Sequence, residues 1–146
     1  MEIQTKVTLD DLEELADLYT LTIDTCAGFE KIREKSEPAF RSTADRFFDL
    51  HKRHAAKIAV LLAKNGGDPE RGGGLMSSVN KLVVTMRSWF DKIDEDIMDQ
   101  VRRGEEHVLS GFDAAIFAAP TPQDQTALEE MRDELNALLA QTADLD

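Results

Sequence analysis

Four long segments of the chain repeat their apolar residues at alternating intervals of three and four positions. This spacing gathers side chains on one face of an α-helix. The first segment shows it at Leu12, Leu15, Tyr19, Thr22, Cys26 and Phe29. No segment alternates apolar and polar residues with the β-branched enrichment that is typical of a strand. The sequence therefore predicts an all-α protein.

Turn-forming residues between these segments set the bounds of the predicted helices. We expect long helices over residues 9–35, 37–64, 94–118 and 123–140, and a shorter crossover helix over residues 75–90.

Three short stretches mark where the helices stop. Ser36 is expected to cap the second helix, with Pro38 in its first turn. Gly66 suits the left-handed conformation that ends helices, and five glycines between residues 66 and 74 predict a loop. The prolines of residues 120–122 separate the last two long helices.

The connections between the helices predict the architecture. The link at Ser36 is so short that the first two helices must run antiparallel, whereas the second and third are joined by a long crossover. That connectivity is associated with ferritin-like folds. We therefore expect residues 1–146 to form one domain, a ferritin-like four-helix bundle.

Three places in the chain carry a resemblance to a known family. The second helix ends in the turn Leu62–Glu70, residues 72–74 are glycines that lead towards Trp89, and the third helix contains Arg103-Gly104-Glu105-Glu106. With these features, residues 18–116 resemble a ferritin-like four-helix-bundle family of bacterial proteins of unknown function. The resemblance implies the architecture and carries no activity.

Charge and composition exclude several classes of function. The chain holds 17 Lys and Arg against 29 Asp and Glu, a net charge of −12, which argues against binding to nucleic acids or anionic lipids. Cys26 is the single cysteine, so no internal disulfide can form. The N-terminal residues lack the pattern of a signal peptide, and no apolar run is long enough to cross a bilayer. We expect a cytoplasmic protein.

Polar residues interrupt two of the apolar faces near the middle of their helices. His51 and His54 lie on the apolar face of the second helix, and Glu105 occupies a similar position on the third. Burying an unpaired charge costs several kcal/mol, so Glu105 should have a partner inside the bundle. The first helix supplies three further neighbours for such a layer: Tyr19, Thr22 and Glu30.

Two interpretations of this layer stay open. His51, His54 and Glu105 could hold iron, manganese or zinc, since imidazole and carboxylate suit these metals. The di-iron centre of a ferritin-like bundle, however, needs a Glu from each of two helices and a Glu-x-x-His from each of the other two. This chain offers His51-x-x-His54 instead. The other interpretation is a hydrogen-bonded polar layer without metal.

Phosphotransfer is a further hypothesis, because histidine phosphotransfer domains are also helical bundles of this size. His54 is followed three residues later by Lys57, as in those domains, but Ile58 stands where they carry a glycine. A phospho-accepting histidine must be exposed, whereas His54 is predicted to face inwards.

Cys26 lies on the apolar face of the first helix and is predicted to be a small buried hydrophobic residue.

Apolar residues outside the main faces point to a second buried surface. Leu18, Leu21, Ile32, Leu50 and Leu62 lie away from the seams of their helices. Such residues can pack against the crossover helix or against another chain. We therefore expect a non-enzymatic interaction or self-association module with a second copy or another protein as partner. The alternatives are a ferritin-like metal or redox protein and a phosphotransfer domain.

Overall fold

A computed structural model describes residues 9–68 and 97–144, with side chains from residue 12 onwards, and these ranges contain α-helices and no strand. Four helices occupy them: α1 (Leu9–Lys35), α2 (Pro38–Lys64), α4 (Ile97–Phe117) and α5 (Pro122–Gln141). The prediction of an all-α protein with four long helices is confirmed. The crossover helix predicted at residues 75–90 and the expected start at residue 94 lie outside the described residues.

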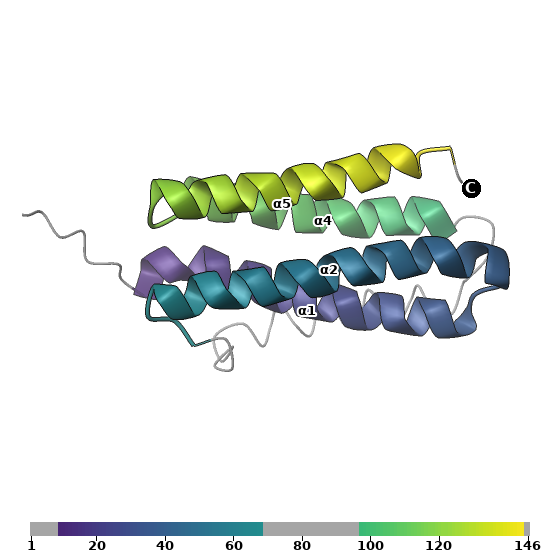
Figure 1. The fold of residues 1–146 in the computed structure, drawn as a ribbon, viewed down its shortest axis with the longest axis horizontal. Helices are drawn as coiled ribbons and strands as arrows, with labels where there is room; N and C mark the ends of the chain where they lie inside the picture. The colour runs from purple at the N-terminus through teal and green to yellow at the C-terminus, as the bar shows by residue number, and fades with distance from the viewer. Residues whose placement is uncertain (1–8, 69–96, 145–146) are drawn as a thin grey trace, which may run out of the picture.

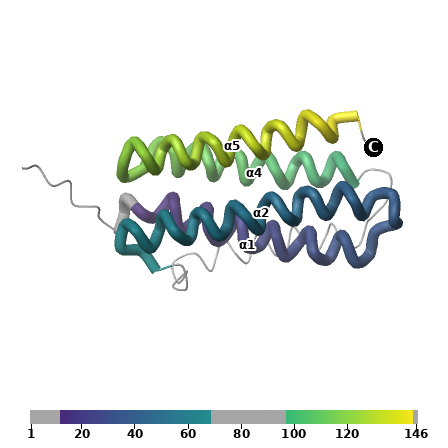
Figure 2. The backbone as a smooth tube through the Cα atoms, viewed as in Figure 1, coloured from purple at the N-terminus to yellow at the C-terminus, as the bar shows by residue number. Residues whose placement is uncertain are grey.

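The four helices form two antiparallel hairpins that share one long axis. Figures 1 and 2 show α1 and α2 as one hairpin and α4 and α5 as the other, packed side by side as in a helical bundle. Among the four neighbouring pairs of described helices, α1 and α2 make the most extensive contact and α2 and α5 the sparsest. None of the described helices combines the length and the hydropathy that a transmembrane segment requires.

The helix ends follow the turn-forming residues with one correction. The N-cap of α2 is Glu37, which makes no side-chain capping hydrogen bond, and not Ser36 as predicted. The Ser36 hydroxyl instead donates to the carbonyl of Ile32 in the last turn of α1, so it completes the end of α1. Gly66 has a φ of 89°, as predicted for the residue that ends α2.

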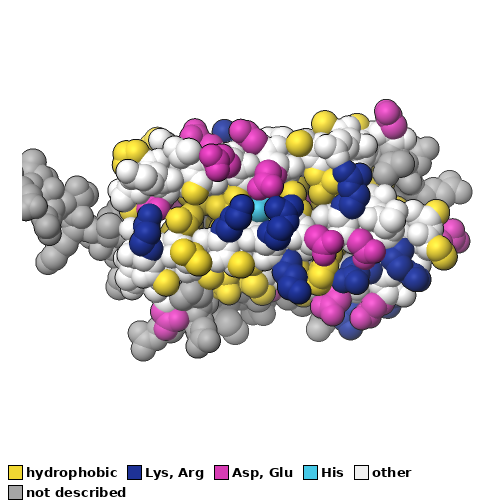
Figure 3. Space-filling model, in the orientation of Figure 1, with side chains coloured by type: hydrophobic (Ala, Val, Ile, Leu, Met, Phe, Trp, Pro, Cys, Tyr) yellow, Lys and Arg dark blue, Asp and Glu magenta, His cyan; other side chains and the backbone are white. Residues whose placement is uncertain are grey.

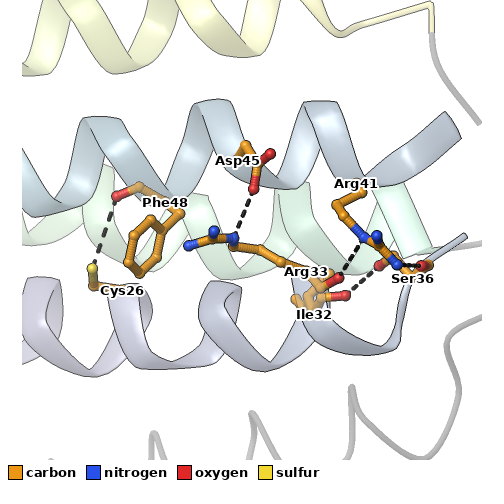
Figure 4. Close-up of polar contacts among 7 residues, drawn as sticks. All are labelled: Cys26, Ile32, Arg33, Ser36, Arg41, Asp45 and Phe48. Carbon is orange, nitrogen blue, oxygen red and sulfur yellow. Dashed lines mark hydrogen bonds and ion pairs between the residues drawn. The ribbon is translucent and has the colours of Figure 1, made fainter. Parts of the chain in front are cut away.

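Charged side chains tie the two helices of the first hairpin together (Figure 4). Arg33 Nε lies 2.6 Å from Asp45 Oδ1, and the Arg33 guanidinium lies 4.5 Å from the centroid of the Phe48 ring. Arg41 donates to the carbonyls of Arg33 and Ser36, at 3.1 Å each. Arg41 thus satisfies carbonyls at the end of α1 that have no helical partner.

The predicted apolar faces form the core. On α4 and α5 the inward faces are buried, and they comprise Met98, Val101, Glu105, Val108, Phe112 and Ala115, and Leu128, Met131, Leu135 and Leu138.

The apolar residues outside the seams are also accounted for within the chain. Leu18, Ile32, Leu50 and Leu62 are buried, and Leu21 packs against the same core. These side chains belong to the same apolar core, so they do not by themselves call for a partner chain.

Candidate functional site

Four polar side chains lie near mid-length of the bundle, and we call them the polar waist: His51 and His54 of α2, Glu105 of α4 and Glu134 of α5. The two histidines stand three residues apart on α2, so both imidazoles share the inward face. Glu105 continues the buried row of α4, in which Val101 and Val108 are fully buried. Three helices thus contribute to one polar layer inside the bundle.

His51 and Glu105 form a pair that is closed off from solvent. His51 Nε2 lies 2.7 Å from Glu105 Oε1, and the two side chains are 0% and 1% exposed. The ring of Phe29 stacks on that of His51, with centroids 5.7 Å apart. When the Glu105 carboxylate is ionised, His51 Nε2 must be the donor. The pair therefore supplies the partner that a buried Glu105 requires.

His54 pairs with a different acid, Glu134. His54 Nε2 lies 3.0 Å from Glu134 Oε1. Arg53 Nη1 lies 3.2 Å from the other carboxylate oxygen of Glu134. The His54 side chain is 0% exposed and that of Glu134 is 40% exposed, so this pair reaches from the core to the surface.

The protonation of this second pair follows from its burial. Desolvation lowers the pKa of His54 to about 4, although the hydrogen bond to Glu134 acts in the opposite direction. Partial burial by itself would raise the pKa of Glu134, but its hydrogen bonds to His54 and Arg53 hold it below the usual value. At neutral pH His54 is therefore neutral and Glu134 ionised, so His54 Nε2–H donates to the carboxylate.

The layer does not gather into a metal cage. Within the described residues, no group of three or more His, Cys, Asp or Glu side chains is placed to hold a metal ion. His51 and Glu105 meet, whereas His54 turns to Glu134, with the two imidazole centroids 6.5 Å apart. The donors that a di-iron centre needs are not assembled in this part of the chain.

Three buried polar atoms of the polar waist nevertheless have no hydrogen-bond partner among the described residues. The Nδ1 atoms of His51 and His54 and the Oε2 atom of Glu105 make no hydrogen bond with the described residues. Most buried polar atoms in proteins are hydrogen-bonded, so these three mark the waist as a place where a small polar group would be stabilised. The metal role of His51, His54 and Glu105 stays a prediction.

The neighbours expected from α1 differ in their placement. Thr22 is buried, and its hydroxyl donates to the carbonyl of Leu18 at 2.7 Å. Tyr19 is half-buried. Glu30 is exposed, contrary to the inward position expected for it, because the preceding residue, Phe29, occupies the inward face of α1. Glu30 is therefore not part of the waist.

The burial of His54 also bears on phosphotransfer. Its imidazole has no exposed surface and its Nε2 is already bound to Glu134. A phosphodonor could not reach this nitrogen in the described conformation.

Cys26 is half-buried, whereas the sequence predicted a buried side chain. Its Sγ lies 3.8 Å from the carbonyl of Phe48, and desolvation raises the pKa of its thiol (Figure 4).

Two acids with clear roles were missed by the sequence analysis. Glu134 was not predicted as a partner of His54. Asp124 is fully buried, and Lys64 and Asn65 donate to its two carboxylate oxygens at 2.5 and 3.0 Å. Its burial would raise the pKa of Asp124, but these hydrogen bonds lower it. Asp124 thus joins the end of α2 to the start of α5.

A groove runs along the sparse contact between α2 and α5. It has a volume of about 870 Å³ and is lined by Val60, Leu61, Ala127, Met131 and Ala137, with Lys57, Glu130, Asp133 and Glu134 among the charged lining residues. Figure 3 shows hydrophobic side chains between the two helices, cationic side chains over α2 and anionic ones over α5. Glu134 also lines a second hollow of about 490 Å³ between the same two helices.

The fold and the site define an all-α helical bundle with a polar waist and an apolar groove on one side. The chain belongs to the family described as a domain of unknown function, DUF2383, whose family model matches residues 10–118. This range includes His51, His54 and Glu105 and ends before α5, which carries Glu134. Comparison with curated proteins and with solved structures gives no match. The match supports membership of a family of unknown function and assigns no activity.

Proposed function

We propose that this protein is a non-enzymatic interaction module and that the α2–α5 groove is its binding surface. The observation that carries the proposal is the apolar groove of about 870 Å³ between α2 and α5, the sparsest of the four neighbouring helix contacts. Val60, at its edge, keeps 64% of its surface exposed. Covering this surface with an apolar partner face would release water from it, which favours association. The single cysteine is compatible with a cytoplasmic setting, which is part of the proposal.

A site-specific photo-cross-linker tests whether the groove is covered by a protein. The photoreactive residue replaces Val60 in the groove or, as the matched control, Lys31, an exposed residue of α1. Irradiation of cells of the encoding organism should give a discrete protein adduct from position 60 and none from position 31. The proposal is wrong if position 60 gives no adduct, or if both positions give the same one.

A second candidate function is metal binding in a ferritin-like bundle, with His51, His54 and Glu105 as ligands. The three unpartnered buried atoms of the waist favour it. A neutral imidazole that donates through Nε2 keeps a lone pair on Nδ1, which is the form that binds metals. The donor set does not fit a two-iron centre, so the candidate is limited to a single iron, manganese or zinc ion.

Metal analysis and thermal unfolding test this candidate together. Protein purified without chelators should contain one of the three metals, and adding that metal should raise the Tm of the wild type but not of Glu105→Gln. Absence of bound metal, combined with an unchanged Tm after addition of each ion, would rule it out.

A further inference from the structure

The two walls of the α2–α5 groove carry opposite charges that the bundle itself leaves unpaired. Lys57 stands on the α2 wall, and Glu130 and Asp133 stand on the α5 wall. All three side chains are exposed, and none forms an ion pair with another described residue. A partner that covers the groove must therefore offer acids to one wall and cations to the other.

Two side-chain hydrogen bonds between α2 and α5 show which residues of the two walls lie at the same height along the helix axis. His54 meets Glu134, and ten residues further along α2, Lys64 meets Asp124, which stands ten residues earlier on α5. The two helices are therefore antiparallel, and each residue forward along α2 corresponds to one residue back along α5. Lys57 is level with residue 131, so Glu130 and Asp133 lie within about 1.5 and 3 Å of its height along the axis.

We propose that the groove binds a second copy of this chain through a two-fold axis that runs parallel to the helices. The inference rests on the proposed function and names its partner. Such an axis places each α2 above the partner's α5 at the same height. Each Lys57 then faces the partner's Glu130 and the partner's Asp133, while Val60 and Ala137 fill the apolar strip between the charges.

The charge pattern selects this axis over the other two-fold arrangement. An axis across the helices would stack α2 on α2, which brings Lys57 towards its own copy and sets the acidic walls against each other. Like charges in contact disfavour an interface, whereas a two-fold interface needs a patch that is complementary to itself. One basic and one acidic wall at matching heights provide that complementarity.

Sedimentation equilibrium of the full chain measures the association. Each copy carries a net charge of −12, so the experiment is run at physiological ionic strength, where charges more than about 8 Å apart are largely screened. The wild type should form a dimer. Lys57→Glu should raise the dimer Kd by at least about tenfold, because the attraction at each of the two symmetry-related Lys57 sites becomes a repulsion.

Two further variants make the test specific. Adding Glu130→Lys and Asp133→Lys to Lys57→Glu exchanges the charges of the walls and should restore the dimer. Lys31→Glu makes the same charge change on an exposed part of α1 and should leave the Kd unchanged. Circular dichroism of each variant confirms that it is folded.

Disulfide trapping distinguishes the two axes. In a Cys26→Ser background, a mixture of Lys57→Cys and Asp133→Cys proteins should give a mixed disulfide dimer on mild oxidation. Lys57→Cys alone should stay monomeric on a non-reducing gel. Efficient formation of a dimer by Lys57→Cys alone would identify the other axis and overturn the proposal.

The remaining outcomes separate this inference from the proposed function. A wild-type protein that stays monomeric up to its solubility limit, or a dimer that Lys57→Glu does not weaken, shows that the groove does not bind a second copy. If position 60 still cross-links to a different protein, the interaction module stands with another partner. If it cross-links to nothing, both proposals fail.

Discussion

Replacing His54 with glutamine is expected to remove part of the acid sensitivity of this protein. The imidazole of His54 is fully buried, and desolvation lowers its pKa from 6.5 to about 4. Glutamine does not titrate and can still donate to Glu134 from its amide. Arg53 and His51, the other charged or titratable groups beside His54, are the same in both proteins.

The sign and the magnitude follow from proton linkage. The unfolded chain binds a proton at His54 below pH 6.5, whereas the folded chain resists protonation until about pH 4. The stabilising contribution of neutral His54 is therefore complete above the unfolded pKa and is lost as the pH falls towards the folded pKa. Because each pKa unit corresponds to 1.36 kcal/mol, the loss between pH 7 and pH 4 is about 3 kcal/mol.

Urea unfolding followed by circular dichroism across this pH range checks the prediction. The free energy of unfolding of the wild type should fall by about 3 kcal/mol more than that of His54→Gln between pH 7 and pH 4. His107→Gln is the matched control, since His107 is exposed, and its profile should follow the wild type. Parallel profiles for wild type and His54→Gln would refute the reasoning.

Three other changes test the contacts that hold the bundle together. Glu105→Leu should lower the free energy of unfolding by about 3 kcal/mol, since it leaves His51 buried without a partner, and His51→Leu/Glu105→Leu should regain most of that loss in urea unfolding. Asp124→Ala should cost about 1–2 kcal/mol at neutral pH, because Lys64 and Asn65 lose their acceptor. That difference from wild type should shrink as the pH falls through the lowered pKa of Asp124; a difference that does not change with pH would contradict this assignment. Gly66→Ala should lower stability by about 1 kcal/mol, since the φ of 89° is strained for alanine, and an unchanged Tm would contradict the argument.

The helices could be predicted closely because their apolar spacing reports directly on burial. The bounds of α1 match the prediction, the start of α2 differs from it by one residue, and each end of α5 differs by one residue. The errors fall at the helix ends, where hydrogen bonds to the backbone determine which residue begins or ends the helix. Ser36 could have capped α2 or closed α1, and its sequence context does not say which carbonyl or amide its hydroxyl will meet.

The polar waist could be predicted only in part. His51, His54 and Glu105 stand on apolar faces, so their inward direction was visible in the sequence. Glu134 stands beside the seam residue Leu135, at a position where an exposed acid is common. Its role depends on how α5 is rotated against α2, which no local pattern specifies.

The polar waist also bears on the register of the bundle. Sliding α4 by one turn, about 5.4 Å, would separate Glu105 from His51 and leave two polar groups buried without partners. Apolar layers alone discriminate less against such a shift, which would bring Val101 or Val108 to the height that Glu105 now occupies. We therefore expect the His51–Glu105 pair to contribute more to selecting the register of α4 than to the free energy of unfolding. The amide spectrum of His51→Leu/Glu105→Leu should show more than one set of peaks, whereas a single set would assign the register to apolar packing.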